Sequence, residues 1–319
     1  MPVTMGMPIT HGRSARRARQ NIDAEAGIKF EVVLGTCCQS LLVRFGMDSA
    51  AEIGQAFNTC LTTVSSCLMV SSLLLLCYIL SSRTFNLVRQ SLFEIIFNLC
   101  ACFMYLSASL YMGFSVSFWL YPKFEMQRAY MAYPAMTAVY LFGNSRRARQ
   151  NIDAEAGIKL CCCRVLTCVN VNFLSTNHGL MKISEVVLGT CCQSLLVRFG
   201  MDSAAEIGQA FNTCLTTVSS CLMVSSLLLL CYILSSRTFN LVRQSLFEII
   251  FNLCACFMYL SASLYMGFSV SFWLYPKFEM QRAYMAYPAM TAVYYIGIIL
   301  GIVHGIDAYL AYKFYKGYF

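Results

Sequence analysis

Charged residues are scarce in this chain. Asp, Glu, Lys and Arg make up 12% of the 319 residues, whereas 58% are hydrophobic. Ordinary soluble domains have about 25% charged and roughly 45–50% apolar residues. A soluble fold cannot bury so much apolar surface, so we expect a lipid bilayer as the solvent. The net charge of +8 does not indicate nucleic-acid binding, because the arginines cluster beside apolar runs, where such residues set topology.

Catalytic and metal-binding patterns are also missing. The sequence has no HExxH, no glycine-rich phosphate loop and no Ser/His/Asp set, and His11, His178 and His304 stand in unrelated settings. We therefore expect no enzyme, no cofactor and no metal site. The N-terminal arginines precede no short apolar core with a cleavage site, which excludes a signal peptide. Residues 1–30 are expected to form a basic, disordered cytoplasmic tail.

Cysteine is abundant, but it is absent from the predicted outer loops. Each half of the chain has seven of the 18 cysteines, all in apolar runs. This placement excludes an extracellular disulfide framework. The other four lie in between, and the Cys triplet beside Lys159 is a candidate for palmitoylation.

A long internal repeat dominates the sequence. Glu31–Tyr140 recurs without substitution as Glu185–Tyr294, 110 residues, and the basic segment Arg16–Lys29 recurs as Arg146–Lys159. Ancient repeats keep a fold and lose identity. Here the loops match as well as the helices, which indicates a recent duplication or an artefact of gene assembly.

An insertion precedes the second copy. Phe30 alone separates Lys29 from Glu31, whereas Leu160–Ser184 lies between the corresponding residues. The codons at both edges are compatible with an intron that starts with GT, ends with AG and interrupts the Phe30 codon. We interpret 160–184 as a translated intron, so that the natural unit would join 1–30 to 185–319.

Stretches without charge predict an all-α membrane fold, a four-helix bundle unit in tandem. The first unit (31–143) has a truncated fourth helix, because the repeat stops after Tyr140; a basic linker and the interpreted intron (144–184) follow, and the second unit (185–319) is complete. The first span is short, with 12 residues between Glu31 and Arg44. Lys and Arg fall on one side of four spans, so both termini are expected in the cytoplasm.

Three glycines at a spacing of four mark the last helix. Gly297, Gly301 and Gly305 allow another helix to approach closely. The partner is either a helix of the same bundle or a second copy of the chain.

An intramembrane polar cluster is predicted at one end of the second unit. Glu185, Glu248, His304 and Asp307 are expected at similar depth, near helix ends that water and headgroups reach. His304 and Asp307 are three residues apart on one helix face, which favours a structural pair over a lipid contact or a proton pathway. Asn98 and Asn252 are expected to form interhelical hydrogen bonds.

The outline resembles one family of tetraspan proteins. The stretches LLVRFGMDSAAEIGQAFNTCLTT, LLLLCYILS and AYPAMTAVYYIGIILGIVHGIDAYLAYKFYKG are similar to MARVEL-domain proteins, within that group to an insect member. Tetraspanins and claudins, by contrast, have outer-loop cysteines. The resemblance implies vesicle trafficking or membrane apposition before myoblast fusion, at the plasma membrane or vesicles. Its implied partners are the lipid bilayer, other membrane proteins and further copies of the chain. A small channel or transporter and a junctional barrier protein remain alternatives.

Overall fold

The computed structural model describes residues 10–120, 134–141, 171–281 and 285–318, and this part of the chain is almost entirely helical, with no strand. Seven of its helices are long and apolar enough to cross a membrane. The all-α membrane fold is thereby confirmed. The seven spans are Ala26–Arg44, Gly54–Leu80, Phe93–Trp119, Asn177–Gly200, Gln209–Leu234, Leu246–Met280 and Ala286–Lys316.

The two units repeat one order of helices. In the first unit these are α1 (Thr10–Leu41), α2 (Met47–Leu80), α3 (Ser82–Arg89) and α4 (Leu92–Ser115). In the second they are α7 (Asn177–Leu195), α8 (Met201–Ile207), α9 (Gln209–Leu234), α10 (Ser236–Arg243), α11 (Leu246–Ser269), α12 (Tyr275–Met280) and α13 (Ala286–Lys316).

Serine side chains fix the turn between the second and third spans. Ser81 and Ser235 accept a hydrogen bond from the backbone of the short helices α3 and α10, and Ser91 and Ser245 do so at the start of α4 and α11. Each side chain satisfies a donor that a helix start leaves free. These caps reverse the chain in a fixed geometry at the same end of both units.

Two expected irregular segments are helical. The basic tail was predicted to be disordered, but α1 starts at Thr10 and continues into the first span. Residues 14–26 contain no glycine or proline and are rich in Ala and Arg, which favour helix. The sequence also predicts a short outer loop at residues 46–56, between the first two spans, but this segment is helical and bends at Gly54, with φ 34° and ψ −105°. Gly208 bends the second unit in the same way, with φ 54°; residues with a Cβ rarely adopt this conformation.

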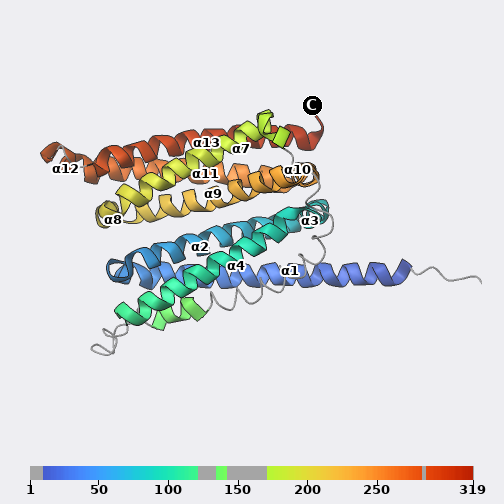
Figure 1. Cartoon of the computed structure of the whole chain (residues 1–319), viewed down its shortest axis with the longest axis horizontal. Coiled ribbons are helices and arrows are strands. Elements are labelled where there is room, and N and C mark those ends of the chain that lie inside the picture. Colours follow the sequence, from blue (N-terminus) through green and yellow to red (C-terminus); the bar gives the residue numbers. More distant parts are fainter. Residues whose placement is uncertain (1–9, 121–133, 142–170, 282–284, 319) are drawn as a thin grey trace, which may run out of the picture.

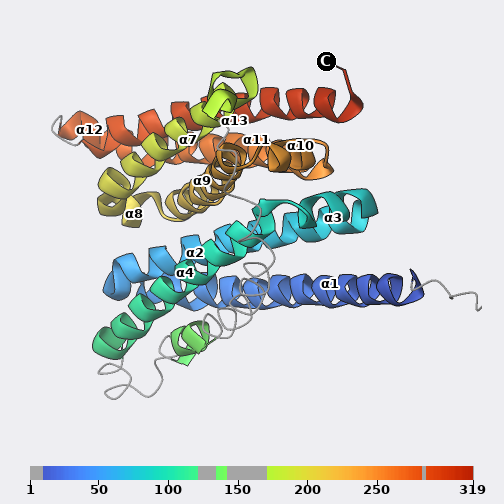
Figure 2. The same ribbon diagram turned by 45° about the vertical axis from the view of Figure 1, so that its right-hand side comes forward.

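The units lie side by side with their helices running in the same directions (Figures 1 and 2). The helices α2 and α9 face each other across the middle, and α3 lies beside α10 at one end. The start of α8 and helix α12 lie at the opposite end (Figure 1).

The predicted truncated fourth helix is described only at residues 134–141, and these are helical. The rest of that segment lies outside the described residues, so the truncation stays a prediction. Three of the seven candidate spans found in the described residues belong to the first unit.

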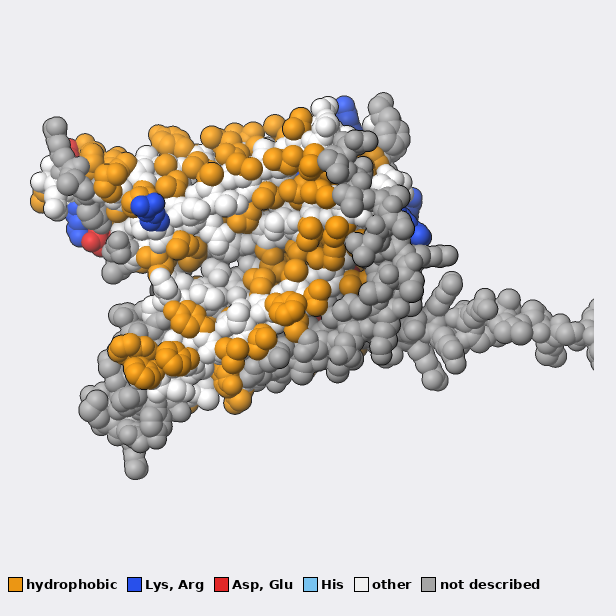
Figure 3. Space-filling view, in the orientation of Figure 1, with side chains coloured by type: hydrophobic (Ala, Val, Ile, Leu, Met, Phe, Trp, Pro, Cys, Tyr) orange, Lys and Arg blue, Asp and Glu red, His pale blue; other side chains and the backbone are white. Residues whose placement is uncertain are grey.

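Apolar side chains cover the middle of the visible face, and Lys and Arg lie toward its ends (Figure 3). Large exposed residues such as Phe103, Phe257 and Leu264 are more than 60% accessible. In water such a surface would aggregate, whereas in a bilayer it contacts lipid tails. The surface thus agrees with membrane spans along the whole bundle.

Candidate functional site: a buried ionic cluster in the second unit

Helix α7 positions the central cation of the site. The Thr176 side chain caps the helix by accepting from the Gly179 backbone at 3.1 Å. A Cβ at Gly179 would lie 2.1 Å from the Phe173 carbonyl oxygen, so only glycine fits there. Phe173 packs against Tyr232 at 5.4 Å between ring centroids. One turn inside this capped start, Lys182 points into the bundle and is completely buried.

Lys182 contacts carboxylates from three helices. Its Nζ lies 2.9 Å from Glu185 on the same helix, 3.6 Å from Glu248 on α11 and 2.8 Å from Asp307 on α13. It also donates to Asn252 Oδ1 at 3.2 Å. One ammonium group therefore links α7, α11 and α13.

Arg243 is the second cation. Its Nη1 donates to Glu248, and its Nη2 donates to Asp307 at 2.9 Å. The same Nη2 lies against His178 Nδ1, which accepts. A guanidinium forks between two acceptors in a way that an ammonium group cannot, so α10 is tied to both α11 and α13.

Neutral groups complete the network. The Tyr232 hydroxyl donates to Glu248 at 2.9 Å, and the Ser225 hydroxyl donates to Glu185 at 2.7 Å. Asn252 Nδ2 donates to Asp307 at 2.9 Å. His304 Nδ1 donates to Asn252 Oδ1 at 2.9 Å and lies 3.5 Å from Glu185. The four long helices of the second unit, α7, α9, α11 and α13, and the short helix α10 each contribute a side chain.

The cluster is sealed from solvent and lipid. The term ionic cluster refers below to seven charged, amide or imidazole side chains, each at most 1% exposed: Lys182, Glu185, Arg243, Glu248, Asn252, His304 and Asp307. Two cations face three carboxylates, so the formal charges of the cluster nearly cancel. Taking charges out of water is costly unless each is paired and hydrogen-bonded. Here nearly every polar atom has a partner, and the geometry holds helices together rather than presenting a reactive group.

The structure brings the four predicted polar residues together, with two differences. They were expected at helix ends within reach of water, but they are buried, since α7 begins eight residues before Glu185. The predicted pair of His304 with Asp307 is not the contact that forms: His304 bonds Asn252 and Asp307 bonds the two cations. Asn252 does form the interhelical hydrogen bonds expected of it.

Sequence reasoning missed the two cations. Lys182 stands three residues before Glu185, a helical spacing for an ion pair. It was assigned to the interpreted intron and so was left out. Arg243 was assigned to a cytoplasmic loop. It lies five residues before Glu248, which is in the first turn of the capped helix α11.

The interpreted intron does not end at a structural boundary. Helix α7 runs through the junction between Ser184 and Glu185 without interruption. Residues 171–184 supply its cap, a buried aromatic ring and the central cation of the cluster. A translated intron has no selected fit to the fold, so this packing favours a coding origin for residues 171–184. The origin of the whole insertion stays a prediction for transcript sequencing, and its four cysteines lie outside the described residues.

The first unit has an incomplete version of the cluster. Glu31 is the equivalent of Glu185; it is buried and accepts from Ser71 at 3.2 Å. Ile28 stands at the position of Lys182, and nothing in the first unit corresponds to His304 and Asp307, because the repeat has ended. Among the described residues, the repeated sequence thus takes part in the full network in the second unit only.

The glycine strip faces its own bundle. A Cβ on Gly297 would lie 2.1 Å from Ser263 Oγ, and one on Gly301 would lie 2.9 Å from Leu260, both on α11. A Cβ on Gly305 would have more room, because the nearest atom, Cys256 Sγ, would lie 3.5 Å away. The described contacts therefore place the close approach between α13 and α11, within the second unit.

The cysteines of the described residues are free thiols, most of them buried among the spans. No group of three or more His, Cys, Asp or Glu side chains suited to a metal is found in the described ranges.

A comparison with known proteins gives the chain a relative. Protein singles bar of Drosophila melanogaster is 47% identical over 161 residues, which are 50% of this chain and 92% of the relative. The chain belongs to the singles bar family. The 161 matched residues are almost the whole length of the relative. A singles bar protein of that length therefore has room for one four-helix unit, whereas this chain has a second. No family model matches the chain, and no solved structure matches it.

Proposed function

We propose that this protein is a non-enzymatic multi-pass membrane protein that acts in membrane apposition or vesicle trafficking, before myoblast fusion. The observation that carries the proposal is the buried ionic cluster, whose polar groups form hydrogen bonds and ion pairs between helices. Membership of the singles bar family and the MARVEL-like outline of the sequence support the same role. In this proposal the unit works through its lipid-facing surface and its ends, by lateral contact with lipids and other membrane proteins.

A rescue experiment tests the proposed role. The complete chain is expressed in Drosophila myoblasts that lack singles bar, and multinucleate fibres are counted. We expect fusion to be restored, and we expect a Lys182→Met variant, which disturbs the cluster, to rescue less than Lys277→Met, whose ion pair with Glu206 is partly exposed. Correct delivery of the unaltered chain to the plasma membrane without any fusion would contradict the proposal.

Liposomes distinguish the main alternative, a small channel or transporter. Ion passage needs polar groups that line an open path. The cluster is at most 1% exposed at each of its seven members, so we expect purified protein in liposomes to conduct neither protons nor cations. Flux that disappears in Asp307→Asn would replace the proposed function by transport.

A further inference from the structure

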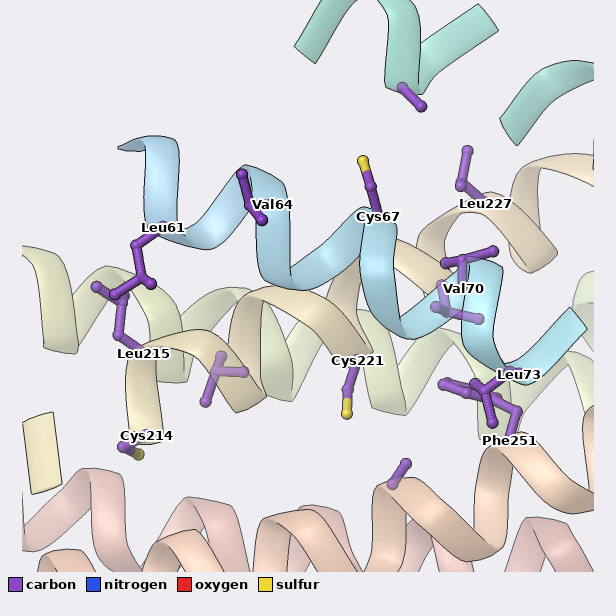
Figure 4. Packing of buried hydrophobic residues seen from close by; sticks show 14 of the residues in the cluster. Leu61, Val64, Cys67, Val70, Leu73, Cys214, Leu215, Cys221, Leu227 and Phe251 are labelled. Atoms are coloured by element: carbon purple, nitrogen blue, oxygen red, sulfur yellow. The ribbon is translucent and has the colours of Figure 1, made fainter. Parts of the chain in front are cut away.

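The surface between the two units is symmetric. Helices α2 and α9 are equivalent segments of the repeat, and they pack against each other along the middle of the molecule. Leu61 lies against its own equivalent, Leu215 (Figure 4). In an 18-residue window, 61% of each of these spans is buried, against 22–39% in the other five. Each of these two helices is therefore covered by its own unit on one side and by the other unit on the other side.

Hydrogen bonds across this surface are reciprocal. The backbone N–H of Leu92 donates to Thr238 Oγ1 at 3.3 Å, and the equivalent Leu246 donates to Thr84 Oγ1 at 3.2 Å. Each threonine thus caps the start of the third span in the neighbouring unit. Reciprocal pairs of this kind define an interface in which both partners use the same patch around a two-fold axis.

An aromatic contact follows the same rule. Phe93 faces its equivalent Phe247 with ring centroids 5.0 Å apart. Thus each of these contacts either joins two equivalent residues or has an equivalent contact in the other direction. This holds at the middle of α2 and α9 and at the end where α3 meets α10.

We propose that this patch is a homodimer surface, whose occupant is a second copy of the four-helix unit. In this chain the tandem repeat supplies that copy covalently, and in a singles bar protein with one unit a second molecule supplies it. A bare patch would lose the threonine caps of two helix-start backbone donors, Leu92 N–H and Leu246 N–H. The inference goes beyond the proposed function and does not depend on it.

Disulfide trapping in the complete chain tests the patch. Leu61→Cys with Leu215→Cys places two thiols across the axis. The matched control, Leu76→Cys with Leu230→Cys, uses the same two helices at equivalent residues that are 42% and 43% exposed. After mild oxidation in membranes, mass spectrometry is expected to find the 61–215 linked peptide in the monomeric band, several-fold above the 76–230 peptide. Equal yields of the two linked peptides would overturn the interface.

The single-unit relative tests the two-fold dimer. Drosophila singles bar, purified in nanodiscs, is expected to contain two copies in each disc by native mass spectrometry or by stepwise photobleaching. A relative that stays monomeric at every protein-to-disc ratio would overturn the homodimer, even where trapping succeeds in the tandem chain.

Discussion

At the scale of single residues, Lys182 determines whether three carboxylates can stay in the interior of the second unit. It contacts Glu185 and Asp307 within 3.0 Å and lies 3.6 Å from Glu248. Removal of one partner of a buried ion pair costs about 3–5 kcal/mol, because the other charge is left uncompensated. Arg243 cannot replace it, since both Nη atoms are already engaged.

We therefore expect Lys182→Met to lower the free energy of unfolding of the second unit by about 3–5 kcal/mol. The control, Lys277→Met, breaks a pair whose side chains are 53% and 29% exposed, and it should cost less than about 1 kcal/mol. Unfolding in mixed micelles with increasing SDS measures both. Similar losses for the two variants would show that the cluster does not stabilise the bundle.

The cluster was predicted only in part, for a physical reason. Burial depth along helices can be inferred from charge-free runs, and this grouped Glu185, Glu248, His304 and Asp307 correctly. Partner choice depends on side-chain directions between helices that are distant in sequence, so His304 was paired with the wrong acceptor. Lys182 was missed because codon arithmetic removed its segment from the fold.

At the scale of elements, the closest helix pair is α11 with α13, which the glycine strip makes possible. Gly301 has Leu260 and the Cys256 carbonyl oxygen directly in front of it, whereas Gly305 has only a thiol at ordinary contact distance. Membrane helices associate without help from the hydrophobic effect, so a loss of close packing is not offset elsewhere.

Gly301→Leu should separate α13 from α11 and cost about 1–3 kcal/mol, the usual range for an overpacked site. Gly305→Ala should leave stability almost unchanged, because its Cβ would meet Cys256 Sγ at 3.5 Å. The same SDS titration compares the variants, and trypsin sensitivity of the Lys313 end reports local loosening. A well-folded Gly301→Leu protein would contradict the packing of α13 on α11.

The spans themselves were predictable, because length and lack of charge are sufficient to recognise a membrane helix. Their ends were not. The basic segment before the first span lacks breakers and continues as helix, and the bends at Gly54 and Gly208 appear only in backbone angles. Local propensity thus outweighed the polar composition that had indicated a disordered tail.

At the scale of the whole molecule, two parallel units are joined through equivalent helices. The size of each unit could be predicted from the repeat. The packing of the two units against each other could not, because an apolar side chain that faces lipid and one that faces protein look alike in sequence. Leu61, at the surface between the units, and Leu76, at the outer surface, illustrate this. They lie on one helix, and they are 3% and 42% exposed.

We expect both units to cross the bilayer in the same direction, with the α3 and α10 ends in the cytoplasm. Cysteines at Gln90 and Gln244, exposed equivalents at those ends, and at the exposed Gln281 near the opposite end test it with a membrane-impermeant maleimide. In intact cells we expect labelling at 281 only, and in inverted vesicles at 90 and 244 only. Labelling of 90 and 244 from opposite sides of the membrane would contradict the parallel arrangement.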